Sequence, residues 1–152
     1  MTDLTENLIR RTAYDKDVAA WATEQAALLR AGELLSIDAK HLAEEIEALS
    51  ARDKRELRRR LALLLQYLLK WQFQPTHRGD SWTTIMLEQR WNIQAIFEDS
   101  PSLAEFLDTK LGSAYSLAVR QAATETKLPL QDFPKKCPYS LSDVLGDDWL
   151  PG

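Results

Sequence analysis

No glycine or proline interrupts the chain between Ala39 and Gln72. These residue types end helices most readily, so their absence predicts one long α-helix of about 50 Å, at 1.5 Å per residue. Ser50, followed three residues later by Asp53, resembles a capping box and marks the one plausible break. We expect one long helix, kinked at Ser50 at most.

The second half of this segment is apolar around most of its circumference. Its apolar residues are Leu57, Leu61, Leu63, Leu64, Leu65, Tyr67, Leu68, Leu69 and Trp71. A helix that is apolar on all sides is buried in a larger protein. The second half therefore predicts the central helix of a bundle.

Capping signals mark the starts and ends of the neighbouring helices. An amphipathic stretch from Val18 to Leu29 closes at Ala31-Gly32, and Asp38 is the expected N-cap of the long helix. Ser81 is the expected N-cap of a helix that reaches Phe97. We expect Ser81 to serve as this cap and not as a nucleophile.

A fifth helix is predicted to begin at Ser100-Pro101, where a capping serine precedes an N1 proline. One face of it carries Leu103, Leu107, Leu111, Ala114, Ala118 and Ala122. After Leu128-Pro129 the prolines and spaced aromatic residues predict an extended strap, with at most one helical turn around Ser140–Leu145.

The predicted fold is a single all-α domain over residues 1–152, with about five helices and an extended C-terminal strap at 128–152. Its 45% hydrophobic and 28% charged residues are typical of a globular protein, and this length suits one core. Residues 1–13 lie before the first predicted helix, and we expect them to be disordered. No internal repeat or linker-like tract divides the chain.

The composition also excludes several environments and partners. Cys137 is the one cysteine, so no internal disulfide can form. The apolar run Leu61–Leu69 is too short to span a bilayer, and residues 1–11 lack the apolar core of a signal peptide. We therefore expect a cytoplasmic location and no membrane partner. The net charge of -4 argues against a protein that mainly holds nucleic-acid backbone.

Short motifs along nearly the whole chain resemble one bacterial family, the domain of unknown function DUF29. They are Tyr14 with Asp17 and Trp21, Glu44 to Glu47, Leu68 to Gln72, Ser81-Trp82, Gln89-Arg90 and Ser100 to Leu103. The resemblance implies no activity, because the family has no assigned function. Members often carry His just before the Leu-Leu-Lys-Trp segment, where this chain has Tyr67, a poor zinc ligand.

Two charged residues continue apolar helix faces and are candidates for a polar pocket. Glu45 shares a face with Leu42, Ile46 and Leu49, and Arg90 continues the stripe Met86, Ile93 and Phe97. Isolated buried charges are costly, so each needs a polar partner. With Arg78 and Lys70 they form the candidate ligand-binding set, Glu45, Arg90, Arg78 and Lys70. An ion pair between the two, or side chains that reach solvent, is the alternative interpretation.

We predict neither a cofactor nor a metal site. His41 and Glu45, spaced i, i+4 with Glu44 and Asp38 close by, are the weak candidates for metal ligands. No Glu-x-x-His or His-Glu-x-x-His motif accompanies them.

A basic run follows the acidic first part of the long helix. It contains Arg52, Lys54, Arg55, Arg58, Arg59 and Arg60, with Asp53 and Glu56 between them. Such a run can bind an acidic surface or phosphates, or it can pair along the helix, as Glu56 and Arg60 would at i, i+4.

The leading hypothesis is a non-enzymatic interaction protein that binds a protein partner or associates with itself. The alternative is an enzyme or ligand-binding protein with a Glu45/Arg90 pocket for an anionic or nucleotide-like ligand. A nucleic-acid role ranks third. The sequence contains no complete catalytic motif, and this is why the enzyme is the alternative and not the leading hypothesis.

Overall fold

The computed structural model describes residues 13–152, and it confirms the all-α fold in that stretch, with seven α-helices and no strand. The prediction of disorder at 1–13 falls on residues outside the described part, except for Ala13. The helices are α2 (Ala13–Lys16), α3 (Val18–Arg30), α4 (Ala39–Phe73), α5 (Asp80–Asp99), α6 (Leu103–Thr109), α7 (Leu111–Thr126) and α8 (Leu141–Leu145).

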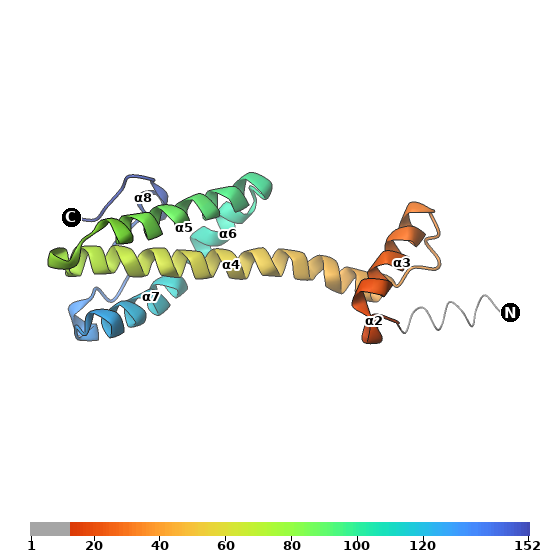
Figure 1. Cartoon of the computed structure of the whole chain (residues 1–152), viewed down its shortest axis with the longest axis horizontal. Helices are drawn as coiled ribbons and strands as arrows, with labels where there is room; N and C mark the ends of the chain where they lie inside the picture. The colour runs from red at the N-terminus through yellow and green to blue at the C-terminus, as the bar shows by residue number, and fades with distance from the viewer. Residues whose placement is uncertain (1–12) are drawn as a thin grey trace. The chain divides into compact units, whose positions relative to one another are not determined.

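The long predicted helix is confirmed as one element, because α4 runs from Ala39 to Phe73 without interruption at Ser50 (Figure 1). Contacts between residues nevertheless group the chain into two compact units, residues 1–50 and residues 51–152. Each unit has its own interior. The prediction of a single domain stays a prediction.

The described part of the N-terminal unit consists of α2, α3 and the first turns of α4. The N-cap of α3 is Asp17, whose carboxylate accepts a hydrogen bond from the Ala20 N–H at 3.0 Å. Gly32, with a φ of 74°, follows the end of α3 in the left-handed region that glycine adopts without strain. Asp38 caps α4 as predicted, and its Oδ1 accepts from the His41 N–H at 3.3 Å.

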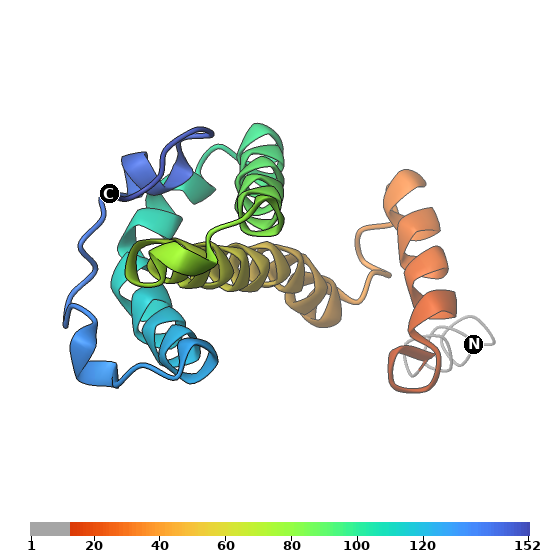
Figure 2. The ribbon, with the colours of Figure 1, turned by 60° about the vertical axis from the view of Figure 1, so that its left-hand side comes forward.

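In the C-terminal unit, the remainder of α4 is the central helix. Figures 1 and 2 show α5 and α7 along different sides of it. Its buried residues are Leu57, Leu61, Ala62, Leu64, Leu65, Gln66, Leu68 and Leu69. The predicted central helix is therefore confirmed within this unit.

Two predicted helix starts are each wrong by two residues. The fourth helix begins at Asp80 with Gly79 at the N-cap, so Ser81 lies inside the first turn and caps nothing. Ser100 ends α5 instead of opening the next helix, since its N–H donates to the Ile96 carbonyl at 2.8 Å. The Leu103 N–H then bonds the Ser100 carbonyl at 3.0 Å, and this tight turn delays α6 to Leu103.

The fifth predicted helix is two helices, separated at Lys110. The Lys110 N–H bonds the Leu107 carbonyl at 3.0 Å, so the chain turns tightly before α7 starts at Leu111. The predicted apolar face keeps its role across the break. Its buried members are Leu103, Leu107, Ala114, Ala118 and Ala122.

The C-terminal segment lies on the C-terminal unit and adds to its core. Phe133, Tyr139 and Val144 are buried in the cluster that includes the α4 leucines. The predicted turn near Ser140 is α8, and Ser140 accepts from the Asp143 N–H at 3.1 Å. A second turn, a 3-10 helix at Leu130–Asp132, was not predicted. Among residues 13–152, no helix combines the length and apolar character needed to cross a membrane.

Candidate functional site

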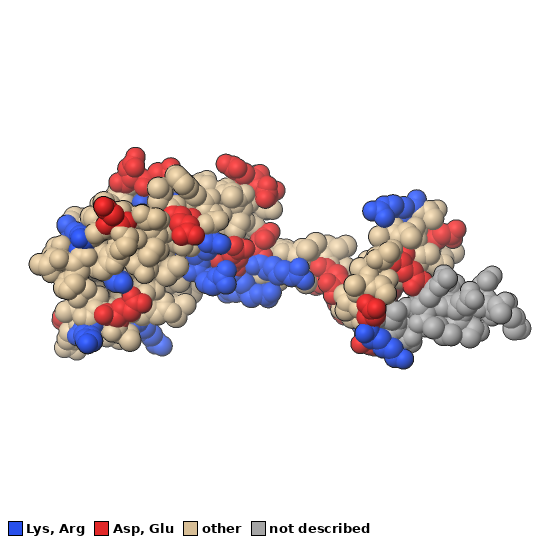
Figure 3. Space-filling model, in the orientation of Figure 1, with Lys and Arg blue, Asp and Glu red and all other residues tan. Residues whose placement is uncertain are grey.

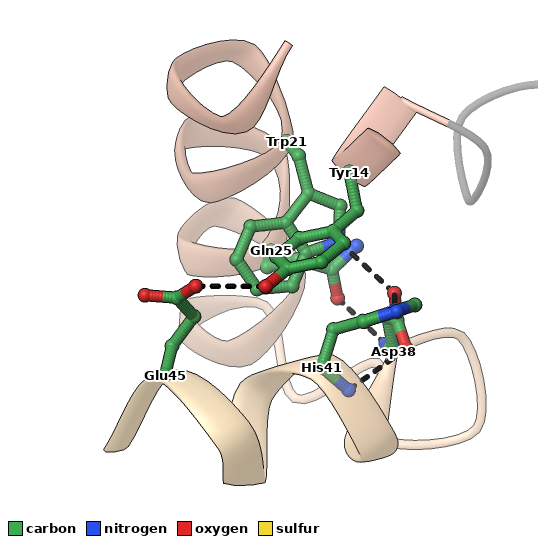
Figure 4. Close-up of polar contacts among 6 residues, drawn as sticks. All are labelled: Tyr14, Trp21, Gln25, Asp38, His41 and Glu45. Atoms are coloured by element: carbon green, nitrogen blue, oxygen red, sulfur yellow. Dashed lines mark hydrogen bonds and ion pairs between the residues drawn. The ribbon is translucent and has the colours of Figure 1, made fainter. Parts of the chain in front are cut away.

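A cluster of polar and aromatic side chains forms the interior of the N-terminal unit (Figure 4). Asp38 lies at its centre. Its Oδ2 accepts from Trp21 Nε1 at 3.1 Å, and its backbone N–H donates to Gln25 Oε1 at 2.7 Å. Trp21 and Gln25 are buried, so α3 is held to the start of α4 largely through hydrogen bonds to one residue.

His41 is fixed against the same carboxylate. Its Nδ1 lies 2.6 Å from Asp38 Oδ2, and because an ionised carboxylate only accepts, Nδ1 carries the proton. The Tyr14 ring stacks on the imidazole, with ring centroids 3.9 Å apart. These contacts leave Nε2 as the ring nitrogen that can accept a hydrogen bond.

Glu45 joins the cluster from the next turn of α4. Its Oε1 accepts from the Tyr14 hydroxyl at 2.9 Å. The prediction that His41 and Glu45 share a face is consistent with this arrangement, because Tyr14 contacts both side chains. In the described part of the chain, no group of three or more His, Cys, Asp or Glu side chains is placed to hold a metal ion.

The hydrogen bonds shift the pKa values of two side chains in the cluster, Asp38 and Tyr14. Burial by itself would raise the pKa of Asp38, but hydrogen bonds from His41 and Trp21 outweigh burial and hold that pKa below its ordinary value. The pKa of Tyr14 is raised, first by its hydrogen bond to Glu45. Asp38 is therefore ionised at neutral pH and Tyr14 is protonated, which is the state in which all these bonds form.

Arg90 is the buried charge of the C-terminal unit, with 2% of its surface exposed. Its guanidinium donates to three carbonyl oxygens of the C-terminal segment, those of Val144 at 2.8 Å, Asp147 at 3.1 Å and Trp149 at 2.7 Å. Burial lowers the pKa of Arg90, and Asp147 and Asp148 oppose that effect. The guanidinium thus anchors the chain end to α5.

Lys70 and Arg78 also have partners inside the C-terminal unit. Lys70 Nζ lies 2.7 Å from Glu125 Oε2 and 4.4 Å from the centre of the Tyr67 ring. Arg78 donates to the Trp71 carbonyl at 2.7 Å and to the Gly152 carbonyl at 3.2 Å. Glu45 instead contacts Tyr14 in the N-terminal unit. The ligand-binding role of Glu45, Arg90, Arg78 and Lys70 stays a prediction.

A surface cavity of about 500 Å³ lies beside Lys70, between α4 and α7. Tyr67 lines it, together with Arg59, Arg120 and Glu125. The Tyr67 ring packs edge-on against Trp82, at 6.3 Å between centroids. Tyr67 thus packs against a neighbouring ring at the edge of this cavity.

Several large apolar side chains lie on the surface of the described part of the N-terminal unit. Among residues 14–50 only Trp21 and Gln25 are buried. Large apolar side chains are exposed there, among them Val18, Leu29, Leu34, Ile46 and Leu49. Exposed apolar side chains become candidates for an interaction site where they gather on one face.

The basic run follows directly along α4, and Figure 3 shows a concentration of Lys and Arg (blue) over this part of the helix. Arg60 pairs with Glu56 at 2.9 Å, which confirms the predicted i, i+4 pair, and it also donates to Gln89 at 3.1 Å. Lys54 lies 5.2 Å from the centre of the Phe106 ring. Arg52, Arg55, Arg58 and Arg59 are exposed.

Sequence reasoning identified Glu45, His41 and Asp38 but missed the partners that join them. Tyr14 and Trp21 were named in the family motif but without their contacts to Glu45 and Asp38, and Gln25 was not singled out. The available signal was the spacing of Trp21 and Gln25, which lie one turn apart on α3. This spacing predicts that both side chains face the same way, but it does not identify Asp38 as their partner.

Comparison with known proteins gives one match. The family model described as domain of unknown function DUF29 matches residues 13–150. No curated protein and no solved structure matches the chain.

Proposed function

Because the chain belongs to the DUF29 family, whose description names no activity, we propose its function from its own surfaces: it is a non-enzymatic protein that associates with itself. We place this association in the bacterial cytoplasm, since the lone Cys137 fits a reducing compartment.

The observation that carries the proposal is the exposed apolar surface of the N-terminal unit. Leu34 is 64% exposed, Ile46 66% and Leu49 59%. Burial of apolar area is the main favourable term in both folding and association. Since residues 14–50 bury few of their apolar side chains, a second chain that covered the exposed ones would add stability.

The alternative, a pocket for an anionic ligand, has less support. The guanidinium of Arg90 already donates from all three of its nitrogens to carbonyl oxygens of its own chain. Three of its five N–H donors are thus used within its own chain, and Asp147 and Asp148, two acidic residues that disfavour an anion, line the small surface cavity beside it. Anchoring of the C-terminal segment explains why a buried arginine is present without a ligand.

The test is the mass of the full chain in solution, measured by sedimentation equilibrium from low to high micromolar concentration. We expect a reversible oligomer whose mass is a multiple of 17.4 kDa. Ile46→Lys places a charge on the exposed surface and should shift the equilibrium to monomer while the helical circular dichroism stays unchanged. A wild-type chain that remains monomeric throughout would rule out the proposal.

A further inference from the structure

The exposed apolar residues of α4 follow the spacing of a coiled-coil seam. Leu42, Ile46 and Leu49 are separated by four and then three residues, which places Ile46 at an a position and the two leucines at d positions. Ile46 and Leu49 are mostly exposed, and Leu42 is half-buried. A seam of this kind is completed by a second helix.

The charges beside this seam change sign halfway along it. Glu45, directly before the a position, is a g residue, and the next g residues are Arg52 and Arg59. Charges at g and e positions set the orientation of paired helices. In a parallel pair, g residues face e residues, and the e residues here are Ser50 and Leu57, which offer no opposite charge.

In an antiparallel pair, g residues face g residues of the other helix. Glu45 of each copy then lies opposite Arg52 of the other, so two oppositely charged pairs form around one two-fold axis. Such a contact is isologous and closes at a dimer. The sign pattern therefore favours an antiparallel second copy of this same chain.

The side chains that would pair are accessible. Arg52 is exposed. Glu45 uses Oε1 to accept from Tyr14, and Figure 4 shows its second carboxylate oxygen turned away from the tyrosine. One carboxylate can therefore hold the interior of its own unit together and still meet a cation of another chain.

We propose that two copies pair through an antiparallel contact of their α4 helices, with Ile46 against Leu49 and Glu45 against Arg52 of the second copy. This inference rests on the proposed self-association and specifies its surface. Beyond the apolar layer, Leu42 meets Asp53 of the second copy, which limits the seam to a short contact around the axis. The pairing uses residues of α4 alone.

The experiment is a charge swap in the full-length chain. Glu45→Arg alone places two arginines opposite each other, and Arg52→Glu alone places two glutamates opposite each other. Each variant should weaken its own dimer about tenfold, because two surface ion pairs become repulsive. When the two variants are mixed, every facing pair is again opposite in charge, so mixed dimers should exceed the statistical half in native mass spectra.

Two control variants separate pairing from folding. Arg58→Glu changes an exposed charge of the same helix at an f position, away from the seam, and should leave the dimer unchanged. Tyr14→Phe removes the hydrogen bond to Glu45 but keeps the carboxylate, and it too should leave the dimer unchanged. The helical circular dichroism of every variant is recorded beside its mass.

The possible outcomes lead to different conclusions. Wild-type monomer at all concentrations overturns both this inference and the proposed function. Wild-type dimer with undiminished dimers of both single variants overturns the antiparallel α4 contact and leaves self-association standing. Weakened single variants that form no excess of mixed dimer also overturn the contact, because general destabilisation would produce that result.

Discussion

The two units of this protein are built from opposite kinds of interior. In the C-terminal unit, the apolar side chains of α4 that include Leu61, Leu65 and Leu68 have no exposed surface. In residues 14–50, one tryptophan and one glutamine are buried, and both bond to Asp38. The C-terminal unit is stabilised mainly by burial of apolar side chains. In residues 14–50, the buried side chains are also fixed by hydrogen bonds to Asp38.

This difference between the two interiors bears on which unit exposes apolar surface that a partner could cover. Apolar burial contributes roughly 25 cal/mol per Å², whereas a hydrogen bond contributes about 1 kcal/mol net because it replaces a bond to water. The C-terminal unit therefore gains most of its stability from the apolar side chains that it buries itself. Residues 14–50 bury fewer apolar side chains and expose Ile46 and Leu49, so the proposed association would add most to the stability of this part.

The largest expected effect comes from a cavity in the C-terminal core. Leu65→Ala should lower the free energy of unfolding by about 2–5 kcal/mol, as buried leucine truncations do. The matched variant Leu49→Ala, on the same helix but 59% exposed, should change it by less than about 0.5 kcal/mol in the monomer. Urea unfolding followed by circular dichroism, at concentrations where the chain is monomeric, measures both.

Equal losses for Leu65→Ala and Leu49→Ala would contradict the comparison. Such a result would mean that Leu49 is covered within its own chain. The same pair measured at high concentration sharpens the test, since Leu49→Ala should then lower the stability that dimer formation adds.

A smaller effect is expected from the polar anchor of the C-terminal unit. Arg90→Lys keeps the charge but replaces the planar guanidinium, which reaches three carbonyls, by one ammonium. We expect a loss of about 2–3 kcal/mol, since buried carbonyls lose their partners. In this variant, amide hydrogen exchange should accelerate more in residues 141–152 than in α4.

Arg78→Lys is the matched variant for this anchor. Arg78 is half-buried and reaches the chain end only at the Gly152 carbonyl. Its substitution should accelerate exchange less than Arg90→Lys. Equal acceleration would contradict this expectation and show that the single contact at Gly152 holds the segment as firmly as the three contacts of Arg90.

Much of the C-terminal unit follows from local sequence. The run from Leu57 to Leu69 specifies a buried helix by composition alone, and the small residues of α7 specify a close-packed face. The exact starts of α5 and α6 did not follow, because Gly79 and not Ser81 takes the N-cap position of α5, and Ser100 ends α5 instead of opening α6.

The polar contacts were harder to predict for a different reason. Helical spacing placed His41 and Glu45 on one face and Arg90 on an apolar stripe. The partner of Glu45 is 31 residues away, and the carbonyls held by Arg90 are 54 to 59 residues away. Spacing along one helix determines which way a side chain faces but not which segment folds back to meet it.

The smallest expected effect concerns acid and the N-terminal unit. The folded-state pKa of Asp38 lies below its unfolded value, so its ionised form contributes stability that is present above about pH 4 and is lost as pH falls through the folded pKa. Asp38→Asn keeps an N-cap oxygen but removes the charge beside His41. At neutral pH the variant should be less stable by about 1 kcal/mol.

The informative quantity is the difference between wild type and Asp38→Asn from pH 6 to pH 2, because other carboxylates titrate in both chains. This difference should shrink toward zero as Asp38 takes up its proton. Hydrogen exchange in α3 localises the effect to the N-terminal unit, and Asp15→Asn, an exposed change in the same unit, should give no such convergence. A difference that stays constant down to pH 2 would mean that the Asp38 charge does not stabilise this unit, and that the hydrogen bonds which an amide can also accept are sufficient to hold α3 on α4.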